Sequence, residues 1–275
     1  MFSSNAFAAV SGSLPAGFMQ GYVGIMIVAV VVGTILDMIH KGSAKYFFAN
    51  ARKARAQGKP VDKASIAVKT LAVDVLASGE FCNPRRRVAH LLTMYGFILY
   101  VVTTALMVFA YPTAATPTPA VVAQLWWLGG LMVMVGGYWF WFFIRVDVAA
   151  EGSSPLRFMR ADLFIVSMLA SVTTGLLWAW LQASGSAASW IFFGLYLLAT
   201  TVLFGGVYWS KFAHMFFKPA AAFDKRIAEA DGTNMNLPLL TRDDPAQRER
   251  HSMELLRDAP MDMGLGIKRE APRHY

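Results

Sequence analysis

The sequence predicts an all-α fold: an integral membrane bundle of five transmembrane helices, with the N-terminus outside and the C-terminus in the cytoplasm. Three observations lead to this prediction. Hydrophobic residues make up 56% of the 275-residue chain and charged residues 15%, whereas soluble domains carry roughly 25% charge. Five apolar segments are long enough to cross a bilayer. The net charge of +8 comes from basic residues beside these segments, so it does not require a nucleic-acid partner.

The five segments each approach or exceed the roughly 20 residues that a transmembrane helix needs. They run near 17–39, 88–110, 120–144, 162–182 and 189–214. Residues 1–217 therefore form the expected transmembrane domain. Residues 218–275 form a cytoplasmic tail that is rich in charge, and segments of this kind often become ordered only on a partner. We expect this tail to dock a partner; the alternative is a solvated tail without a role.

The distribution of charge between the loops predicts the orientation in the membrane. Residues 40–87 hold eleven Lys or Arg and three Asp or Glu, while residues 111–119 and 183–188 hold no charge. Basic loops stay on the cytoplasmic side, so loop 40–87 and the tail are expected there and the protein in the cytoplasmic (inner) membrane. Residues 63–81 are compatible with a helix that either lies flat on the membrane surface or forms a solvated connector.

The third apolar segment carries two pairs of glycines with the same spacing. Gly129 and Gly136 are seven residues apart, and so are Gly130 and Gly137. This spacing places each pair near one face of a helix. Small residues let helices approach closely in lipid. We therefore expect a packing helix here, with a cofactor-binding face as the alternative.

Two histidines lie about one helical turn inside the basic boundary, His90 in the second segment and His214 at the end of the fifth. A haem b in a helix bundle needs two axial ligands on facing helices, commonly neutral imidazoles. If these helices are neighbours, both histidines could ligate one haem iron. Arg86, Arg87 and Lys211 would then pair with its propionates. The alternative is that each histidine is an interfacial residue bonded to a carbonyl or a headgroup.

Several other chemistries lack the residues they need. The outer half of the predicted bundle holds no histidine, so a second bis-histidine haem has no ligands there. The lone cysteine, Cys82, cannot form an internal disulfide or a Cys-based cluster. No phosphate-binding or dinucleotide-binding glycine pattern is present. The sequence therefore accommodates at most one bis-histidine haem b, near the cytoplasmic face.

A second constellation pairs Asp37 with His40, three residues apart and hence on one face of the first segment. A carboxylate in an otherwise uncharged span is costly and points to a functional site. The pair could pass protons to or from a quinone near the cytoplasmic leaflet. Tyr95 and Tyr208 could line the quinone pocket. The alternatives are a solvated interfacial pair, aromatic residues that only anchor the helices, and His40 as a haem ligand.

Two stretches carry a resemblance to a known family. Residues 82–97, CNPRRRVAHLLTMYGF, resemble the start of the second helix in the membrane cytochrome b family that includes the γ subunit of respiratory nitrate reductase. Residues 209–219, WSKFAHMFFKP, resemble the end of the fifth helix. The lack of a fused ferredoxin domain and the final residues GLGIKREAPRHY are most similar to the membrane anchors associated with dissimilatory adenylylsulfate reductase.

The resemblance implies a non-catalytic subunit of an oxidoreductase complex. A cytoplasmic flavin/iron–sulfur enzyme of the adenylylsulfate reductase type would carry out the sulfur chemistry, and the anchor would exchange its electrons with the quinone pool. His90 and His214 match two haem-ligand helices of the family, while the other ligands of its dihaem members have no match here. Two further interpretations remain open: a purely structural anchor without a cofactor, and a small membrane transporter.

Overall fold

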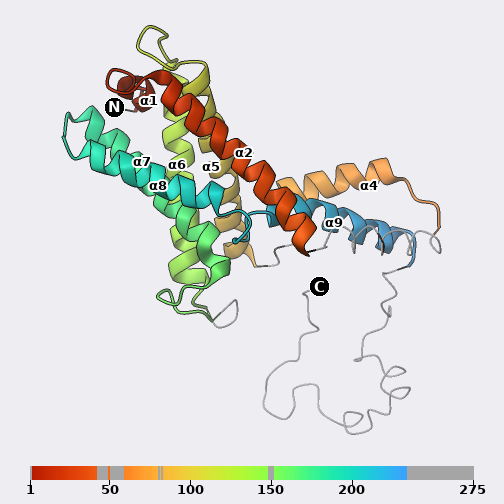
Figure 1. Cartoon of the computed structure of the whole chain (residues 1–275). Helices are drawn as coiled ribbons and strands as arrows, with labels where there is room; N and C mark the ends of the chain where they lie inside the picture. Colours follow the sequence, from red (N-terminus) through yellow and green to blue (C-terminus); the bar gives the residue numbers. More distant parts are fainter. Residues whose placement is uncertain are drawn as a thin grey trace.

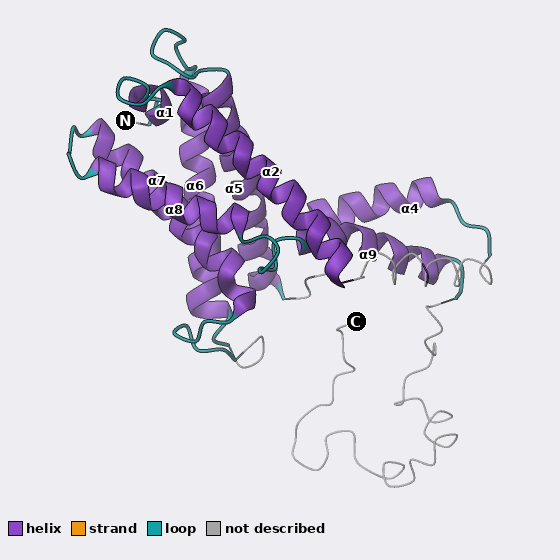
Figure 2. Cartoon of the chain, viewed as in Figure 1, coloured by secondary structure: helices purple, strands orange, loops and turns teal. Residues whose placement is uncertain are grey.

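The computed structural model of the chain describes residues 2–41, 49, 59–79, 81, 83–147 and 152–233. Within these ranges all regular structure is helical and no strand is present, which confirms the all-α class (Figure 2). Cys82 and the expected docking segment beyond residue 233 lie outside the described residues. In chain order the elements are α1 (Ala6–Val10), α2 (Ala16–Lys41), α4 (Lys63–Lys69), η1 (Thr70–Leu76), α5 (Pro84–Phe109), α6 (Ala120–Trp139), η2 (Phe140–Ile144), η3 (Arg160–Asp162), α7 (Leu163–Ala183), α8 (Ser189–Gly205) and α9 (His214–Ala230).

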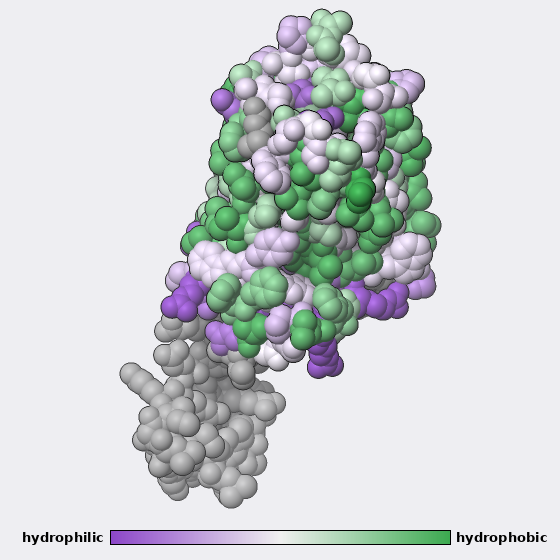
Figure 3. All heavy atoms as spheres, turned by 90° about the vertical axis from the view of Figure 1, so that its left-hand side faces the viewer, coloured by the Kyte–Doolittle hydropathy of each residue, from purple (hydrophilic) through white to green (hydrophobic). Residues whose placement is uncertain are grey.

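Four helices are long and apolar enough to cross a membrane: Ala16–His40, Pro84–Phe109, Ala120–Ile144 and Arg160–Ala183. These candidate spans indicate a multi-pass membrane protein. Along the bundle α5 packs on α6, α6 on α7 and α7 on α8, while α2 contacts both α8 and α5 (Figure 1). A space-filling view shows a largely apolar surface with strongly hydrophilic residues gathered mainly at its lower edge (Figure 3).

The two ends of the bundle differ in charge. We call one the basic end, because the alternating direction of the helices brings Arg85, Arg145 and Lys211 there. The opposite end, which we call the α1 end, holds α1 and the uncharged turns after α5 and α7 (Figure 1). The candidate site residues predicted from the sequence belong to the basic end.

The expectation of one continuous helix over 189–214 is wrong. α8 ends at Gly205, turns follow, and His214 is the first residue of α9 instead of the last residue of a span. Two consecutive glycines, Gly205 and Gly206, explain the break, because glycine costs about 1 kcal/mol relative to alanine in a helix interior. At 17 residues, α8 is shorter than the four candidate spans.

The glycines of α6 pack it against both neighbouring helices, as predicted. Toward α5, a Cβ atom added to Gly129 would lie 2.8 Å from the backbone nitrogen of Tyr100, and one added to Gly136 would lie 2.6 Å from the Ala89 carbonyl oxygen. Both distances are too short for real carbon atoms. The α5 and α6 backbones are therefore in direct contact, an approach that only glycine permits.

The second pair of glycines faces α7. A Cβ added to Gly130 would lie 2.9 Å from the Leu176 side chain, and one added to Gly137 would lie 2.6 Å from that of Leu169. Both leucines are buried in the core. The two pairs thus serve two different neighbours, and α6 is the central helix of the α5–α6–α7 layer.

The sequence pattern did not reveal α1, which closes the α1 end. Asn5 caps this helix by accepting hydrogen bonds from the backbone N–H groups of Phe7 and Ala8. Its Nδ2 also donates to the carbonyls of Met107 and Tyr111, at 3.3 and 2.9 Å. The Phe7 ring is buried against Trp126, Trp178 and Tyr196. The N-terminal residues are therefore part of the packed bundle.

A fully buried arginine, Arg145, follows η2 and binds residues at and before η3. The Arg145 guanidinium donates to Asp162 Oδ2 at 2.6 Å and to the carbonyls of Ser154 and Arg157 at 2.7 and 2.8 Å. It also lies 4.2 Å from the centre of the Trp141 ring. A buried charge is costly unless it is paired and hydrogen-bonded. The ion pair and the hydrogen bonds of its two terminal nitrogens offset much of this cost, although Nε has no hydrogen-bond partner among the described residues, so Arg145 has a structural role.

Outside the bundle, α4 and η1 lie side by side with α9 (Figure 1). Asp62 caps α4 by accepting from the N–H groups of Ala64 and Ser65. Asp74 of η1 accepts two hydrogen bonds from Arg226 of α9, one of them from NH2 at 2.8 Å. This hydrogen-bonded guanidinium holds the pKa of Asp74 below its ordinary value of 3.8. We call α4, η1 and α9 the surface layer.

We expect bulky substitutions at the α5–α6 contact to destabilise the bundle. Gly136→Val should lower the free energy of unfolding by about 1–3 kcal/mol, because the added carbons overlap the α5 backbone. Gly24→Val is the matched control, since nothing lies within 4 Å of a Cβ at that position of α2. Thermal unfolding of both purified variants in detergent measures the difference. Equal midpoints would contradict a direct backbone contact.

We expect the attachment of α9 to η1 to depend on pH. Because the pKa of Asp74 is lowered in the folded state, the pair stabilises the fold above the ordinary aspartate pKa, and this stabilisation is lost as the pH falls through the lowered value. The partly exposed pair contributes less than about 1 kcal/mol. Spin labels at Ala67 and Ala221 should show a broadened distance distribution at acid pH and, at neutral pH, in Asp74→Asn.

The control for this measurement is Glu229→Gln. It removes the exposed ion pair between Glu229 and Lys225, whose atoms are 3.9 Å apart, and leaves the hydrogen bonds between Asp74 and Arg226 in place. The distance distribution should then match that of the unmodified chain at neutral pH. A distribution in Asp74→Asn that is as narrow as in this control would show that other contacts hold α9.

Candidate functional site

His90 lies on the first turns of α5 and contacts the segment that precedes this helix. Its Nδ1 is 3.1 Å from the Ser78 hydroxyl, and its ring centre is 4.7 Å from that of Phe81. Ser78 is buried and has a positive φ of 48°, so the chain turns sharply there. The half-buried imidazole is thus held by a tight turn, a partnership that the sequence reasoning missed.

His214 begins α9 and is exposed. Its Nδ1 donates a hydrogen bond to the Lys211 carbonyl oxygen, and its ring centre is 6.2 Å from that of Phe164 on α7. Because a carbonyl only accepts, Nδ1 carries the proton and Nε2 carries the lone pair. Histidines that bind metals commonly have this kind of hydrogen bond at the other ring nitrogen.

A cluster of phenyl rings joins the elements that carry the two histidines. Phe97 of α5 has its ring centre 6.4 Å from Phe164, 6.3 Å from Phe204 and 6.5 Å from Phe212. Phe164 and Phe212 are 5.2 Å apart. Phe97 follows His90 by seven residues, so it lies on the same face of α5, about 10 Å further into the bundle. Phe97 therefore lies deeper in the bundle than His90, and Phe164 connects the cluster to His214.

The fit of these residues to a haem can be judged from their contacts. Each imidazole has an anchored Nδ1, which suits ligation through Nε2. The two rings have separate neighbours, Phe81 for His90 and Phe164 for His214. The phenylalanine cluster fills the adjacent space in the interior. Ligation of one haem by both histidines remains a prediction.

The basic residues assigned to the propionates lie around the same end. Arg87 Nε donates to the Ala77 carbonyl oxygen at 2.8 Å, and the Arg86 guanidinium lies 5.7 Å from the centre of the Phe81 ring. Lys211 is exposed. Arg87 thus contacts Ala77 and Arg86 contacts Phe81, and their pairing with propionates remains a prediction.

The structure places Asp37 and His40 against the turns that follow α8. Asp37 is 1% exposed although it lies near the end of a helix that faces lipid over much of its surface. One turn earlier, a Cβ on Gly33 would lie 2.9 Å from the Val207 side chain, so this face of α2 packs on the turn. The His40 ring centre is 5.6 Å from that of Tyr208. A buried carboxylate, an imidazole and a phenol therefore lie on two adjoining segments.

Tyr95, the other residue predicted to line a quinone pocket, lies elsewhere. Its hydroxyl donates to the Leu76 carbonyl oxygen of η1 at 2.6 Å. Its hydrogen bond is thus with the surface layer, whereas Tyr208 contacts α2. The sequence reasoning placed both tyrosines at one depth, but it had no means of telling which helix each would face.

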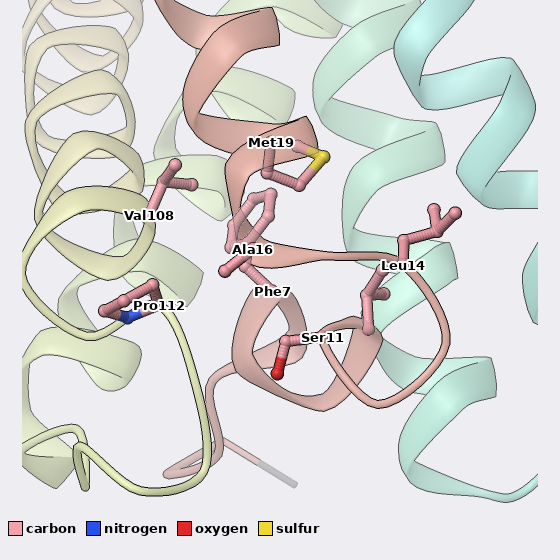
Figure 4. A pocket seen from close by; sticks show the side chains of 8 residues that line it. Phe7, Ser11, Leu14, Ala16, Met19, Val108 and Pro112 are labelled. Carbon is pink, nitrogen blue, oxygen red and sulfur yellow. The ribbon is translucent and has the colours of Figure 1, made fainter.

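A small apolar pocket lies at the α1 end, where α1, the start of α2 and the end of α5 meet (Figure 4). It holds about 220 Å³ of empty space, part of it open to solvent. Among its lining side chains only Ser11 is polar, and its hydroxyl already donates to the Ala8 carbonyl oxygen. The lining offers no acid, base or nucleophile, so it does not suggest chemistry. The lining residues are Phe7, Val10, Ser11, Leu14, Ala16, Met19, Val108 and Pro112.

Within the part of the chain that the structure describes, no three His, Cys, Asp or Glu side chains gather as a metal site. The candidate chemistry therefore rests on pairs: Asp37 with His40, and His90 with His214. Comparisons with known proteins add no constraint. No protein-family profile matches the chain, no curated protein matches its sequence, and no solved structure matches its fold.

Proposed function

We propose that this chain is the membrane subunit of a redox complex, which holds a cytoplasmic flavin/iron–sulfur enzyme of the adenylylsulfate reductase type and exchanges its electrons with quinone. The observation that carries the proposal is the burial of Asp37 in an apolar helix, next to His40 and Tyr208. A buried intramembrane carboxylate is costly and is retained where it transfers protons or binds a ligand. The sequence resemblance supplies the class of partner.

The proposed topology puts the basic end in the cytoplasm. Its loops carry the excess of Lys and Arg that marks that side. α8 is the fifth span: its 17 residues reach about 26 Å, close to the roughly 30 Å hydrocarbon core, and a short mismatch is accommodated by local thinning of the bilayer. The N-terminus is then outside, and the surface layer faces the partner enzyme's compartment.

Reduction of a quinone to a quinol takes up two electrons and two protons. In the proposed site His40 is exposed at the basic end and can take protons from water, while Asp37 places a carboxyl group for proton exchange inside the apolar boundary. Tyr208 supplies an aromatic wall beside His40. The electrons come from the partner's iron–sulfur cluster, and a haem b at His90 and His214 would, when bound, relay them one at a time.

A substitution at Asp37 tests the quinone site. Asp37→Asn preserves the shape of the side chain and removes its proton exchange, so quinone-dependent electron transfer by the complex should fall about a hundredfold, a typical contribution of a positioned acid or base. Glu229→Gln, an exposed carboxylate outside the bundle, should retain full activity. Unchanged turnover in Asp37→Asn, with normal assembly of the complex, would refute the site.

The haem prediction has a direct spectroscopic test. The purified complex should show a reduced b-type absorption band, which His90→Ala and His214→Ala should each abolish. His40→Ala should keep the band, since that residue is assigned to the quinone. Loss of the band only in His40→Ala would show that His40 is a haem ligand. Absence of the band in the unmodified protein would show that no haem b is bound, and electrons would then pass directly from the partner's iron–sulfur cluster to quinone.

A purely structural anchor is the second candidate, and one observation favours it. The phenylalanine cluster fills the basic half of the bundle with close-packed rings, as a tether without a cofactor would. Such an anchor would bind the partner enzyme and show neither the absorption band nor quinone reduction. The two measurements above therefore separate the candidates.

A further inference from the structure

The surface layer has an apolar stripe that no other described residue covers. In α4 and at the start of η1, Ala64, Val68 and Leu71 recur at spacings of four and three residues, which places them on one helix face. Val68 is 68% exposed and Leu71 is 55% exposed. So much exposed aliphatic surface on a half-polar helix needs an apolar environment.

The opposite face of the same helix contacts α9. Thr70 is buried, and Asp74, four residues later, is bonded to Arg226. The stripe therefore points away from α9. Figure 1 shows that α4 lies on the side of α9 nearer the α1 end.

Side chains of α5 hold the end of η1 at membrane depth. Tyr95 donates to the Leu76 carbonyl and Arg87 donates to the Ala77 carbonyl. Tyr95 is eleven residues into α5, roughly 16 Å along its axis from Pro84. Part of this distance is covered by the tyrosine side chain. Even so, the end of η1 lies beside the first turns of a membrane-spanning helix and not beyond its tip.

Two exposed lysines of α4, Lys63 and Lys69, lie on the polar part of the helix, one to each side and each more than about 100° from the centre of the stripe. Lysines in this position bury their aliphatic stems along apolar surface and keep the ammonium group at the level of lipid headgroups. This arrangement is typical of helices that lie in the membrane interface.

We infer that α4 and η1 form an in-plane membrane-binding element: the stripe lies at the boundary between headgroups and acyl chains of the basic-end leaflet, and Lys63 and Lys69 contact anionic phospholipid headgroups. The occupant of the exposed stripe is thus lipid. α9 is carried on the water-facing side of this element through the Asp74–Arg226 pair. The surface layer then has a fixed height relative to the bilayer.

Spin labelling of the full-length chain in nanodiscs tests this inference. In a Cys82→Ala background, labels introduced through Val68→Cys and Leu71→Cys should be accessible to oxygen and shielded from a water-soluble nickel chelate. A label through Ala221→Cys on exposed α9 should show the reverse. Labels at 68 and 71 that are as accessible to nickel as the label at 221 would overturn the inference. Spin–spin broadening between copies would overturn it too, because a second chain would then cover the stripe.

The assignment of the lysines has its own measurement. The depth of the label at 71 should be greater in nanodiscs containing phosphatidylglycerol than in pure phosphatidylcholine, and the combined Lys63→Gln and Lys69→Gln variant should lose this difference. Lys225→Gln on α9 is the matched control and should keep it. Equal depth of the unmodified chain in both lipids would overturn the binding of anionic headgroups.

Discussion

The direct backbone contact between α5 and α6 is the constraint on which the rest of the bundle depends. Lipid tails are as apolar as the side chains of a membrane helix, so helices in a bilayer associate through close packing instead of a hydrophobic driving force. Gly96, Gly129 and Gly136 supply that packing on one side of α6, and Gly130 and Gly137 supply it toward α7. With α6 fixed between two neighbours, the starts of α5 and α7 meet at one end of the bundle, and the candidate site is assembled there.

The basic end combines an interior filled with aromatic rings and a surface held by polar contacts. The phenylalanine cluster excludes water from the region beneath His90, while Ser78, Arg87 and Tyr95 fasten the chain before α5 onto α5 itself. The three consecutive residues 76–78 thus each form a hydrogen bond with a side chain of α5. Residues predicted to bind haem, its propionates or quinone, such as His90, Arg87 and Tyr95, also form contacts within the fold. A cofactor or substrate bound at this end would therefore have to be accommodated alongside these contacts.

Much of the fold was predictable because composition, segment length and glycine spacing act locally along the chain. The all-α class, four of the spans and the packing role of the α6 glycines follow from such signals. The fifth helix was predicted to extend to residue 214, whereas it ends at Gly205. The apolar character of the segment does not by itself reveal that Gly205 and Gly206 interrupt the helix. The contacts of His90 with Ser78 and of His40 with Tyr208 join residues far apart or in irregular turns, and helical periodicity carries no information about them. In the sequence, only Gly79, which follows the positive-φ residue Ser78, offered a local hint of a turn.

The cap made by Asn5 bears on how the protein is put together. This residue is synthesised among the first, but the groups it binds, around Met107, Tyr111 and Thr118, are made about a hundred residues later. Two residues that contact Phe7, Trp178 and Tyr196, are synthesised later still. The beginning of the chain can therefore reach its final contacts only after the residues of α8 have been synthesised.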